Sequence, residues 1–152
     1  MSFEKFKSEL EASSESVARV AYSLVRKGYG IRVPPLHVPE TQDDGIPDEG
    51  DLFVIGKDGK ERWIEVRCFV GSTEAMLHGF PCLIVERVER LDKNPPDFYY
   101  LMGSEMNMAF VMDVAANRKR FSVQKIRNGT DGRLVDCYMA PHDCFSHVKL
   151  RG

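Results

Sequence analysis

Two carboxylates and one guanidinium lie on neighbouring segments that have the pattern of a β-hairpin. Asp51 opens an apolar run that ends at Ile55, and Glu65 and Arg67 lie in a second β-rich run, 61–69. Because strand side chains alternate between faces, Glu65 and Arg67 share one face of their strand. Carboxylate oxygens are the ligands that Mg²⁺ prefers, and two of them leave coordination positions for water and a phosphate oxygen. This combination predicts a divalent-cation site for phosphoryl chemistry, with Arg67 holding the phosphate.

The register of the hairpin decides whether these three charged side chains meet. A connecting turn with an odd number of residues places Asp51 opposite Glu65 or Arg67. A two-residue turn places Asp51 opposite Val66 instead. The sequence leaves both registers open. The simplest alternative is that all three side chains lie on the solvated face of an ordinary hairpin, because charged residues are mostly exposed.

Helical spacing, Pro and Gly breaks and β-rich runs predict the elements around this hairpin. In chain order, the expected elements are one helix or two over 3–27 ended by Gly28, a strand at 29–33, an exposed loop at 34–50, the hairpin at 51–69, a short helix or loop at 72–79, strands at 81–85, 98–102 and 108–114, a second hairpin at 121–139 and a short helix within 141–150. This order predicts an α/β (α+β) domain, with an N-terminal helix followed by a central mixed β-sheet and flanking helices.

The helix and hairpin together resemble the core of the PD-(D/E)XK nuclease superfamily, which has the restriction-endonuclease-like fold. In that family a helix carrying a glutamate precedes the hairpin and often ends in a Gly-aromatic pair, as Glu15 precedes Gly28 and Tyr29 here. An aspartate opens the first hairpin strand, where this chain has Asp51, and an acidic residue at the place of Glu65 lies on the second. The resemblance covers about residues 10–115 and extends to small single-domain members carried by phages and other mobile elements.

The resemblance implies a nuclease that hydrolyses phosphodiester bonds of nucleic acid with metal-activated water. It implies Asp51 and Glu65 as ligands of Mg²⁺ or Mn²⁺, and Glu15 as an accessory acidic residue that reaches the metal through water. The expected partner is nucleic acid, DNA in preference to RNA. A homodimer is compatible with this prediction, because dimerisation is common among nucleases that cut two strands.

The chain departs from the family pattern at Arg67, where the family usually has lysine. Arginine stays protonated and cannot act as a base, although it can stabilise negative charge. The alternative is therefore a catalytically degenerate restriction-endonuclease-like domain that binds nucleic acid or protein. Asp48 competes with Asp51 for the first acidic position, and Asp51 is preferred because it directly precedes the strand.

Length and charge set the outer limits of these predictions. The 152 residues fit a single domain, 1–152, and the formal net charge of −2 excludes a bulk electrostatic attraction to nucleic acid or membrane. The basic run 117–120 and a second group near Arg26 could still contact phosphate locally. No apolar run approaches the ~18 residues that span a bilayer, and the N-terminus lacks a signal-peptide apolar core. We therefore expect a cytoplasmic protein with no membrane partner.

Cysteines, histidines and aromatic residues offer weaker alternatives. Zinc binding by Cys137, His142 and Cys144 would require an irregular spacing, so core cysteines near a surface histidine are the preferred interpretation. A Cys68 nucleophile paired with a histidine lacks any recognisable motif. The aromatic run 98–100 could stack on bases, but its apolar flanks favour a buried strand.

Overall fold

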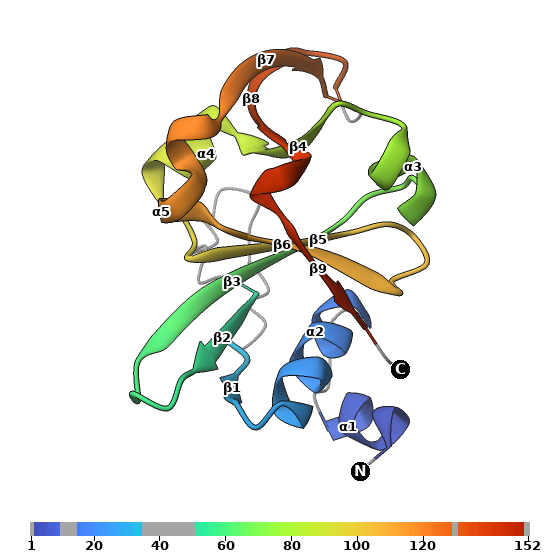
Figure 1. Ribbon diagram of the computed structural model, residues 1–152, viewed down its shortest axis with the longest axis vertical. Coiled ribbons are helices and arrows are strands. Elements are labelled where there is room, and N and C mark those ends of the chain that lie inside the picture. Colours follow the sequence, from blue (N-terminus) through green and yellow to red (C-terminus); the bar gives the residue numbers. More distant parts are fainter. Residues whose placement is uncertain (1, 10–14, 35–50, 129–130, 151–152) are drawn as a thin grey trace.

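The computed structural model describes residues 2–9, 15–34, 51–128 and 131–150. A six-stranded sheet lies at the centre, with two helices on one face and a three-stranded sheet on the other (Figure 1). The strands are β1 (Gly30–Arg32), β2 (Leu52–Ile55), β3 (Glu61–Cys68), β4 (Cys82–Arg87), β5 (Phe98–Met102), β6 (Met108–Asp113), β7 (Ser122–Arg127), β8 (Leu134–Pro141) and β9 (Ser146–Lys149). The helices are α1 (Phe3–Glu9), α2 (Glu15–Arg26), α3 (Thr73–His78), α4 (Val88–Lys93) and α5 (Val114–Asn117), with 3₁₀ turns at Arg118–Arg120 and His142–Cys144. The predicted α/β (α+β) class, with a central mixed sheet and flanking helices, is confirmed.

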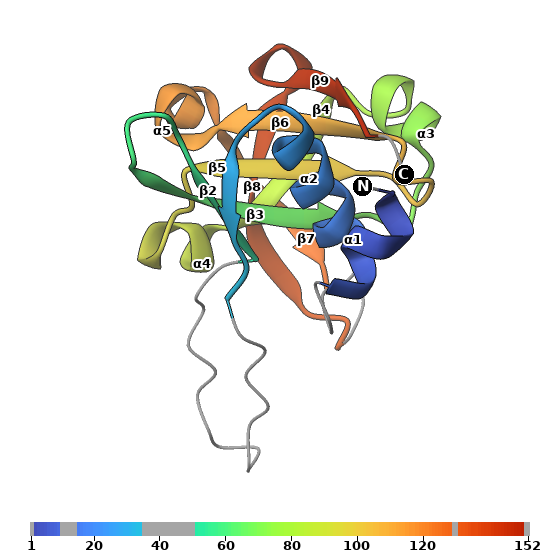
Figure 2. The same ribbon diagram turned by 90° about the horizontal axis from the view of Figure 1, so that it is seen from below.

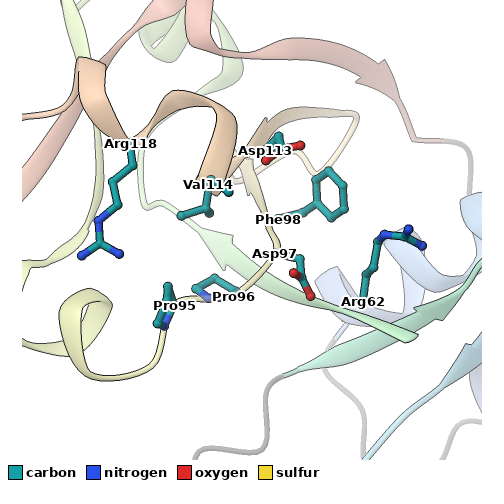
Figure 3. Close-up of a pocket in the computed structure, with 9 residues that line it drawn as sticks. Arg62, Pro95, Pro96, Asp97, Phe98, Asp113, Val114 and Arg118 are labelled. Carbon is teal, nitrogen blue, oxygen red and sulfur yellow. The ribbon is translucent and has the colours of Figure 1, made fainter. Parts of the chain in front are cut away.

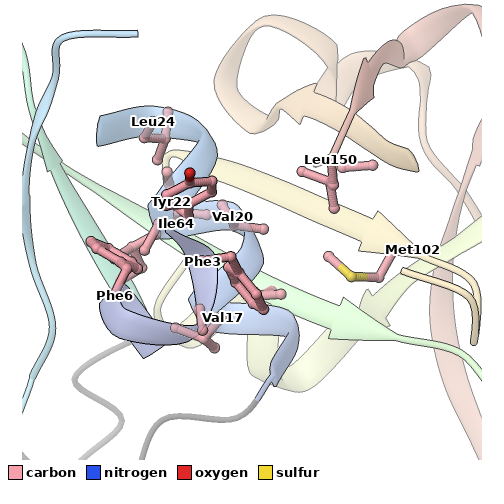
Figure 4. Packing of buried hydrophobic residues seen from close by; sticks show 14 residues of the cluster. Phe3, Phe6, Val17, Val20, Tyr22, Leu24, Ile64, Met102 and Leu150 are labelled. Carbon is pink, nitrogen blue, oxygen red and sulfur yellow. The ribbon is translucent and has the colours of Figure 1, made fainter. Parts of the chain in front are cut away.

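Helix α2 lies across one face of the larger sheet, as Figure 2 shows from below. Its apolar side chains, including Val17, Val20 and Leu24, recur at helical spacing and are buried against the strands (Figure 4). The helix ends before Gly28, which adopts a φ of 91° and donates its N–H to the Val25 carbonyl at 2.9 Å. The predicted C-terminal glycine is thus confirmed. No helix in the described ranges is long and apolar enough to cross a membrane.

The larger sheet has the order β1-β2-β3-β5-β6-β9 and contains one parallel pair, β3 with β5. Parallel neighbours need a crossover connection, and here the chain passes through α3, β4 and α4 between them. That excursion supplies the first strand of the smaller sheet, whose order is β4-β8-β7. The crossover therefore lays β4 over the face of the larger sheet that α2 does not cover.

Strand β3 presents two different faces to these layers. Ile64 and Val66 belong to the core cluster beneath α2. On β5, Tyr99 pairs with Glu65 and Leu101 pairs with Arg67. Both β5 residues belong to the core cluster between the two sheets. Because side chains alternate along a strand, Glu65 and Arg67 point toward the smaller sheet.

The short helix expected within 141–150 is wrong. Only His142–Cys144 forms a 3₁₀ turn, and Ser146–Lys149 forms β9, which pairs antiparallel with β6. Without β9, strand β6 would present a row of unpaired backbone groups at the sheet edge. Pairing with this edge outweighs the local preference of residues 146–149 for a helix. Helices α4 and α5 were not expected, because six and four residues are too few to show a helical period. The loop expected at 34–50 lies outside the described residues from position 35 onward.

Truncation of Ile64 tests the packing of α2 on the sheet, since this side chain is only 1% exposed. We expect Ile64→Val to lower the free energy of unfolding by about 0.5–1.5 kcal/mol and Ile64→Ala by about 2–5 kcal/mol, because each leaves a larger cavity. Urea denaturation followed by circular dichroism measures both. Val123→Ala, at an exposed position of β7, is the control and should stay within about 0.5 kcal/mol of wild type. Equal losses at the two positions would contradict the burial of Ile64.

Candidate functional site

The turn between β2 and β3 fixes the register that the sequence left open. Ile55 pairs with Glu61, so the turn comprises residues 56–60, an odd number. It is closed by the Gly56 N–H, which donates to the Lys60 carbonyl at 3.1 Å. The last pair of the ladder is Leu52 with Ile64, and one further step sets Asp51 opposite Glu65. The two carboxylates therefore belong to one face of the hairpin.

Asp51 is anchored to the strand that carries its partner. Its Oδ2 accepts the Val66 N–H at 2.9 Å and so extends the β2–β3 ladder by one side-chain hydrogen bond. This bond directs the carboxylate over β3, next to the Glu65 backbone. The side chain is half-buried, so part of it remains accessible. Asp48, the competing acidic position, lies outside the described residues.

Glu65 is buried, with 6% of its surface exposed, in a strand that otherwise carries apolar residues inward. A buried carboxylate is costly unless a positive charge or hydrogen bonds accompany it. Arg67 supplies that charge, because its Nη2 lies 3.6 Å from Oε1 of Glu65. The Arg67 side chain remains 31% exposed, so part of it reaches the surface. The structure thus brings Glu65 and Arg67 together, and it bonds Asp51 to the backbone of the neighbouring Val66.

Glu86, on β4 of the smaller sheet, completes a buried cluster that the sequence analysis missed. Its Oε2 accepts hydrogen bonds from Arg67 Nη2 and from the Tyr99 hydroxyl, the latter at 3.2 Å. Its Oε1 accepts the Arg87 N–H at 2.9 Å. The β4–β8 ladder shifts register between Ile84 and Glu86. Such a bulge re-aims side chains. A glutamate directly after the apolar run 82–85 was the available sequence signal.

Tyr99 lies beneath this cluster with 1% of its surface exposed. Burial raises the pKa of its hydroxyl above the ordinary value, and the neighbouring negative charge of Glu86 raises the pKa further. The hydroxyl therefore keeps its proton and acts as a hydrogen-bond donor to Glu86. The aromatic run 98–100 belongs to a buried strand, as expected. The hydrogen bond from the Tyr99 hydroxyl to Glu86 was not expected.

Glu15 lies apart from this cluster in the layering of the fold. It is the first residue of α2, which covers the opposite face of the larger sheet. Its carboxylate pairs with Arg19 at 3.2 Å and is 41% exposed. The accessory role expected for Glu15 stays a prediction.

The basic residues that were expected to contact phosphate are largely engaged with carboxylates. Arg118 pairs with Asp92, Arg120 binds both oxygens of Asp143, and Lys125 pairs with Asp136. Arg32, near the hairpin, forms two hydrogen bonds with Glu61. These surface ion pairs offset the positive charge of the basic residues. The run 117–120 is therefore not an isolated basic patch.

A separate polar pocket of about 540 Å³ lies at the opposite end of β3 (Figure 3). Asp97 and Asp113 lie there between Arg62 and Arg118. Each aspartate already serves the backbone: Asp97 accepts the Trp63 N–H at 2.7 Å, and Asp113 accepts the Ala116 N–H at 3.1 Å. Both aspartates thus support the local backbone, so this pocket is a weaker candidate for the functional site than the cluster around Glu65.

Two carboxylates are the metal-ligand set that the cluster offers. Within the described ranges, no three or more His, Cys, Asp or Glu residues are grouped to hold a metal ion, and this includes Cys137, His142 and Cys144. Hard oxygen donors such as Asp51 and Glu65 suit Mg²⁺ or Mn²⁺, which commonly retain several water ligands. The pKa of the Cys68 thiol is raised by burial, which opposes its use as a nucleophile.

Comparison with known proteins leaves the family open. No family model matches this chain, and no curated protein matches it either. The chemistry of the cluster must therefore be judged from its geometry.

Replacement of Tyr99 by Phe tests the buried hydroxyl through the pH dependence of stability. The folded protein keeps the Tyr99 proton above pH ~10, where the unfolded chain releases it. Because the unfolded state then binds fewer protons, this residue lowers stability by about 1.4 kcal/mol for each pH unit above that point. Tyr99→Phe should be less stable by about 1.5–3 kcal/mol at pH 7, owing to the lost hydrogen bond to a charged group.

The difference between Tyr99→Phe and wild type should narrow above pH ~10. Urea unfolding between pH 7 and pH 11 measures it, with Tyr29→Phe at an exposed position as the control. A constant difference across this range would show that Tyr99 ionises normally in the folded protein.

Proposed function

We propose that this protein is a metal-dependent nuclease whose divalent cation is held by Asp51 and Glu65. The observation that carries the proposal is the hairpin register, which sets these two carboxylates on one face with Arg67 two residues further along β3. A helix, an antiparallel hairpin and a parallel strand in this order are compatible with the restriction-endonuclease-like layout. The PD-(D/E)XK assignment is part of the proposal.

Each residue has a distinct part in this chemistry. Asp51, with one oxygen fixed by the Val66 N–H, offers a carboxylate of defined orientation. Glu65 offers a second from a largely water-excluded position. A bound Mg²⁺ or Mn²⁺ would lower the pKa of a coordinated water and offset charge on the phosphate. Arg67 offers a guanidinium, which suits phosphate oxygens, on a side chain that is 31% exposed.

A second candidate is a nucleic-acid- or protein-binding domain of the same fold that has lost catalysis. The observation that favours it is the engagement of Arg67 with Glu86 across the two sheets. A guanidinium in that position ties β3 to β4 and cannot accept a proton from water. In this second candidate, the charged cluster joins the two sheets, and binding of nucleic acid or protein does not depend on a metal ion.

Calorimetric titration with Mn²⁺ tests the cation site without a choice of substrate. We expect Asp51→Asn and Glu65→Gln each to weaken Mn²⁺ binding by about tenfold or more, because each removes one ligand charge. Glu89→Gln, at an exposed position of α4, is the matched control and should bind as wild type does. Circular dichroism confirms that each variant is folded. Wild-type affinity in both site variants would exclude the two carboxylates as ligands.

Incubation with single- and double-stranded DNA and RNA separates the two candidates. The nuclease should cleave at least one substrate only when Mg²⁺ or Mn²⁺ is present, and Asp51→Asn should lose this activity. The binding domain should bind nucleic acid equally with the cation and with chelator, and should leave it intact. Electrophoresis of the products and fluorescence anisotropy of labelled substrates give the two readouts.

A further inference from the structure

A basic pocket of about 420 Å³, which we call the α2–β9 pocket, lies between the C-terminal end of α2 and strand β9 (Figure 1). Residues 22, 23, 26 and 27 line one side of it and residues 147–149 line the other. Of these seven described residues four are basic and none is acidic, the basic ones being Arg26, Lys27, His147 and Lys149. The volume falls within the ~300–1,000 Å³ range of small-molecule pockets.

The cations of this pocket differ from other basic groups of the surface because no carboxylate offsets them. Arg118 and Arg120 each form an ion pair with an aspartate. Within the part of the chain that the structure describes, Arg26, Lys27 and Lys149 form no ion pair. Positive charge without a counter-charge in the same pocket attracts anions.

The dipole of α2 accounts for only part of this charge. Cations are favoured in the last turn of a helix, which explains Arg26 and Lys27. It does not explain Lys149, which belongs to a separate strand. The carbonyl groups at a helix end repel an anion, but here one of them is engaged twice. The Leu24 carbonyl accepts the N–H groups of Lys27 and Tyr29, both at 3.1 Å.

Strand β9 supplies backbone donors at the same pocket. It is the last strand of the larger sheet, and its neighbour Leu150 donates its N–H to the Asn107 carbonyl at 3.0 Å. Hydrogen-bonded pairs alternate along an antiparallel ladder, so the next such pair involves Val148. The N–H groups of His147 and Lys149 therefore point away from β6, toward the sheet edge that borders the pocket.

We propose that the α2–β9 pocket binds the phosphate group of a small soluble molecule. The guanidinium of Arg26, whose Cζ lies 5.7 Å from the centroid of the Tyr22 ring, suits phosphate oxygens. Lys27 adds an ammonium group, and the edge of β9 adds neutral N–H donors. A phosphate group brings the negative charge and the acceptor oxygens that such donors require.

A compact ligand fits this site better than a polyanion does. The pocket has a limited volume, and Arg118 and Arg120 in the basic run 117–120 are paired with carboxylates. A polyanion binds along an extended basic surface, whereas one phosphate group needs only a local one. The site uses neither Asp51 nor Glu65, so the proposal does not rest on the proposed function.

An NMR titration of the full chain, with amide resonances as the readout, tests the proposal. Inorganic phosphate and adenosine monophosphate are the probes, at an ionic strength held constant with chloride. Each probe should shift the amide resonances of His147 and Lys149 and reach saturation. Arg26→Gln and Lys27→Gln should each weaken binding about tenfold, because each removes a hydrogen bond between charged groups.

Two control variants separate this site from a general charge effect and from the cation site. Lys93→Gln, at an exposed position of α4, removes the same charge elsewhere and should bind both probes as wild type does. Asp51→Asn should also bind them as wild type does. Shifts that never saturate would overturn the proposal, as would equal affinities in Arg26→Gln, Lys27→Gln and Lys93→Gln.

Two further probes identify the carrier of the phosphate group. Phosphatidylcholine vesicles that contain phosphatidic acid are tested by sedimentation, and a short single-stranded DNA is tested by fluorescence anisotropy. Each should bind the double variant Arg26→Gln with Lys27→Gln as it binds wild type. If the double variant lost binding to vesicles or DNA but kept its affinity for adenosine monophosphate, the assignment to a small molecule would be overturned.

Discussion

The turn at residues 56–60 determines which face each side chain of β2 and β3 occupies. With this turn, Leu52 pairs with Ile64, and both enter the core beneath α2. The same register sends Glu65 and Arg67 toward the smaller sheet. A slip of one residue in this pairing would exchange the two faces of one strand relative to the other. Either Glu65 and Arg67 would then face α2, or Leu52 and Val54 would turn away from it. The apolar core and the charged cluster therefore both depend on this register.

The charged cluster is difficult to explain as a stabilising device. Glu65 and Glu86 are both buried, and the Arg67 guanidinium contacts both of them. A buried ion pair commonly contributes no more than apolar residues of the same volume, because desolvation offsets the attraction. The surrounding interface between the sheets is built from apolar residues such as Leu101 and Val85. An apolar contact would have tied β3 to β4 as well, which favours a chemical role for the charges.

Local pattern was sufficient for most of the fold. The spacing in α2, the Gly28 cap and the runs of β-forming residues in the hairpins predict elements that the structure contains, because each depends on near neighbours. Strand β9 could not be predicted in this way, since its conformation is set by the free edge of β6, more than 30 positions earlier. Glu86 was missed for the same reason: the crossover brings it to Arg67, and only its place in an apolar strand marked it in the sequence.

Electrostatics weigh against binding of a polyanion without a metal ion. The chain has a net charge of −2, and Arg118, Arg120 and Lys125 each face a carboxylate. Nucleic-acid affinity depends strongly on cations that neutralise phosphates, so each of these pairs would have to open to contribute. A divalent cation between Asp51 and Glu65 would offset the net negative charge that these carboxylates and Glu86 give to the surroundings of Arg67. Metal-dependent binding is therefore easier to reconcile with this surface than binding by side chains alone.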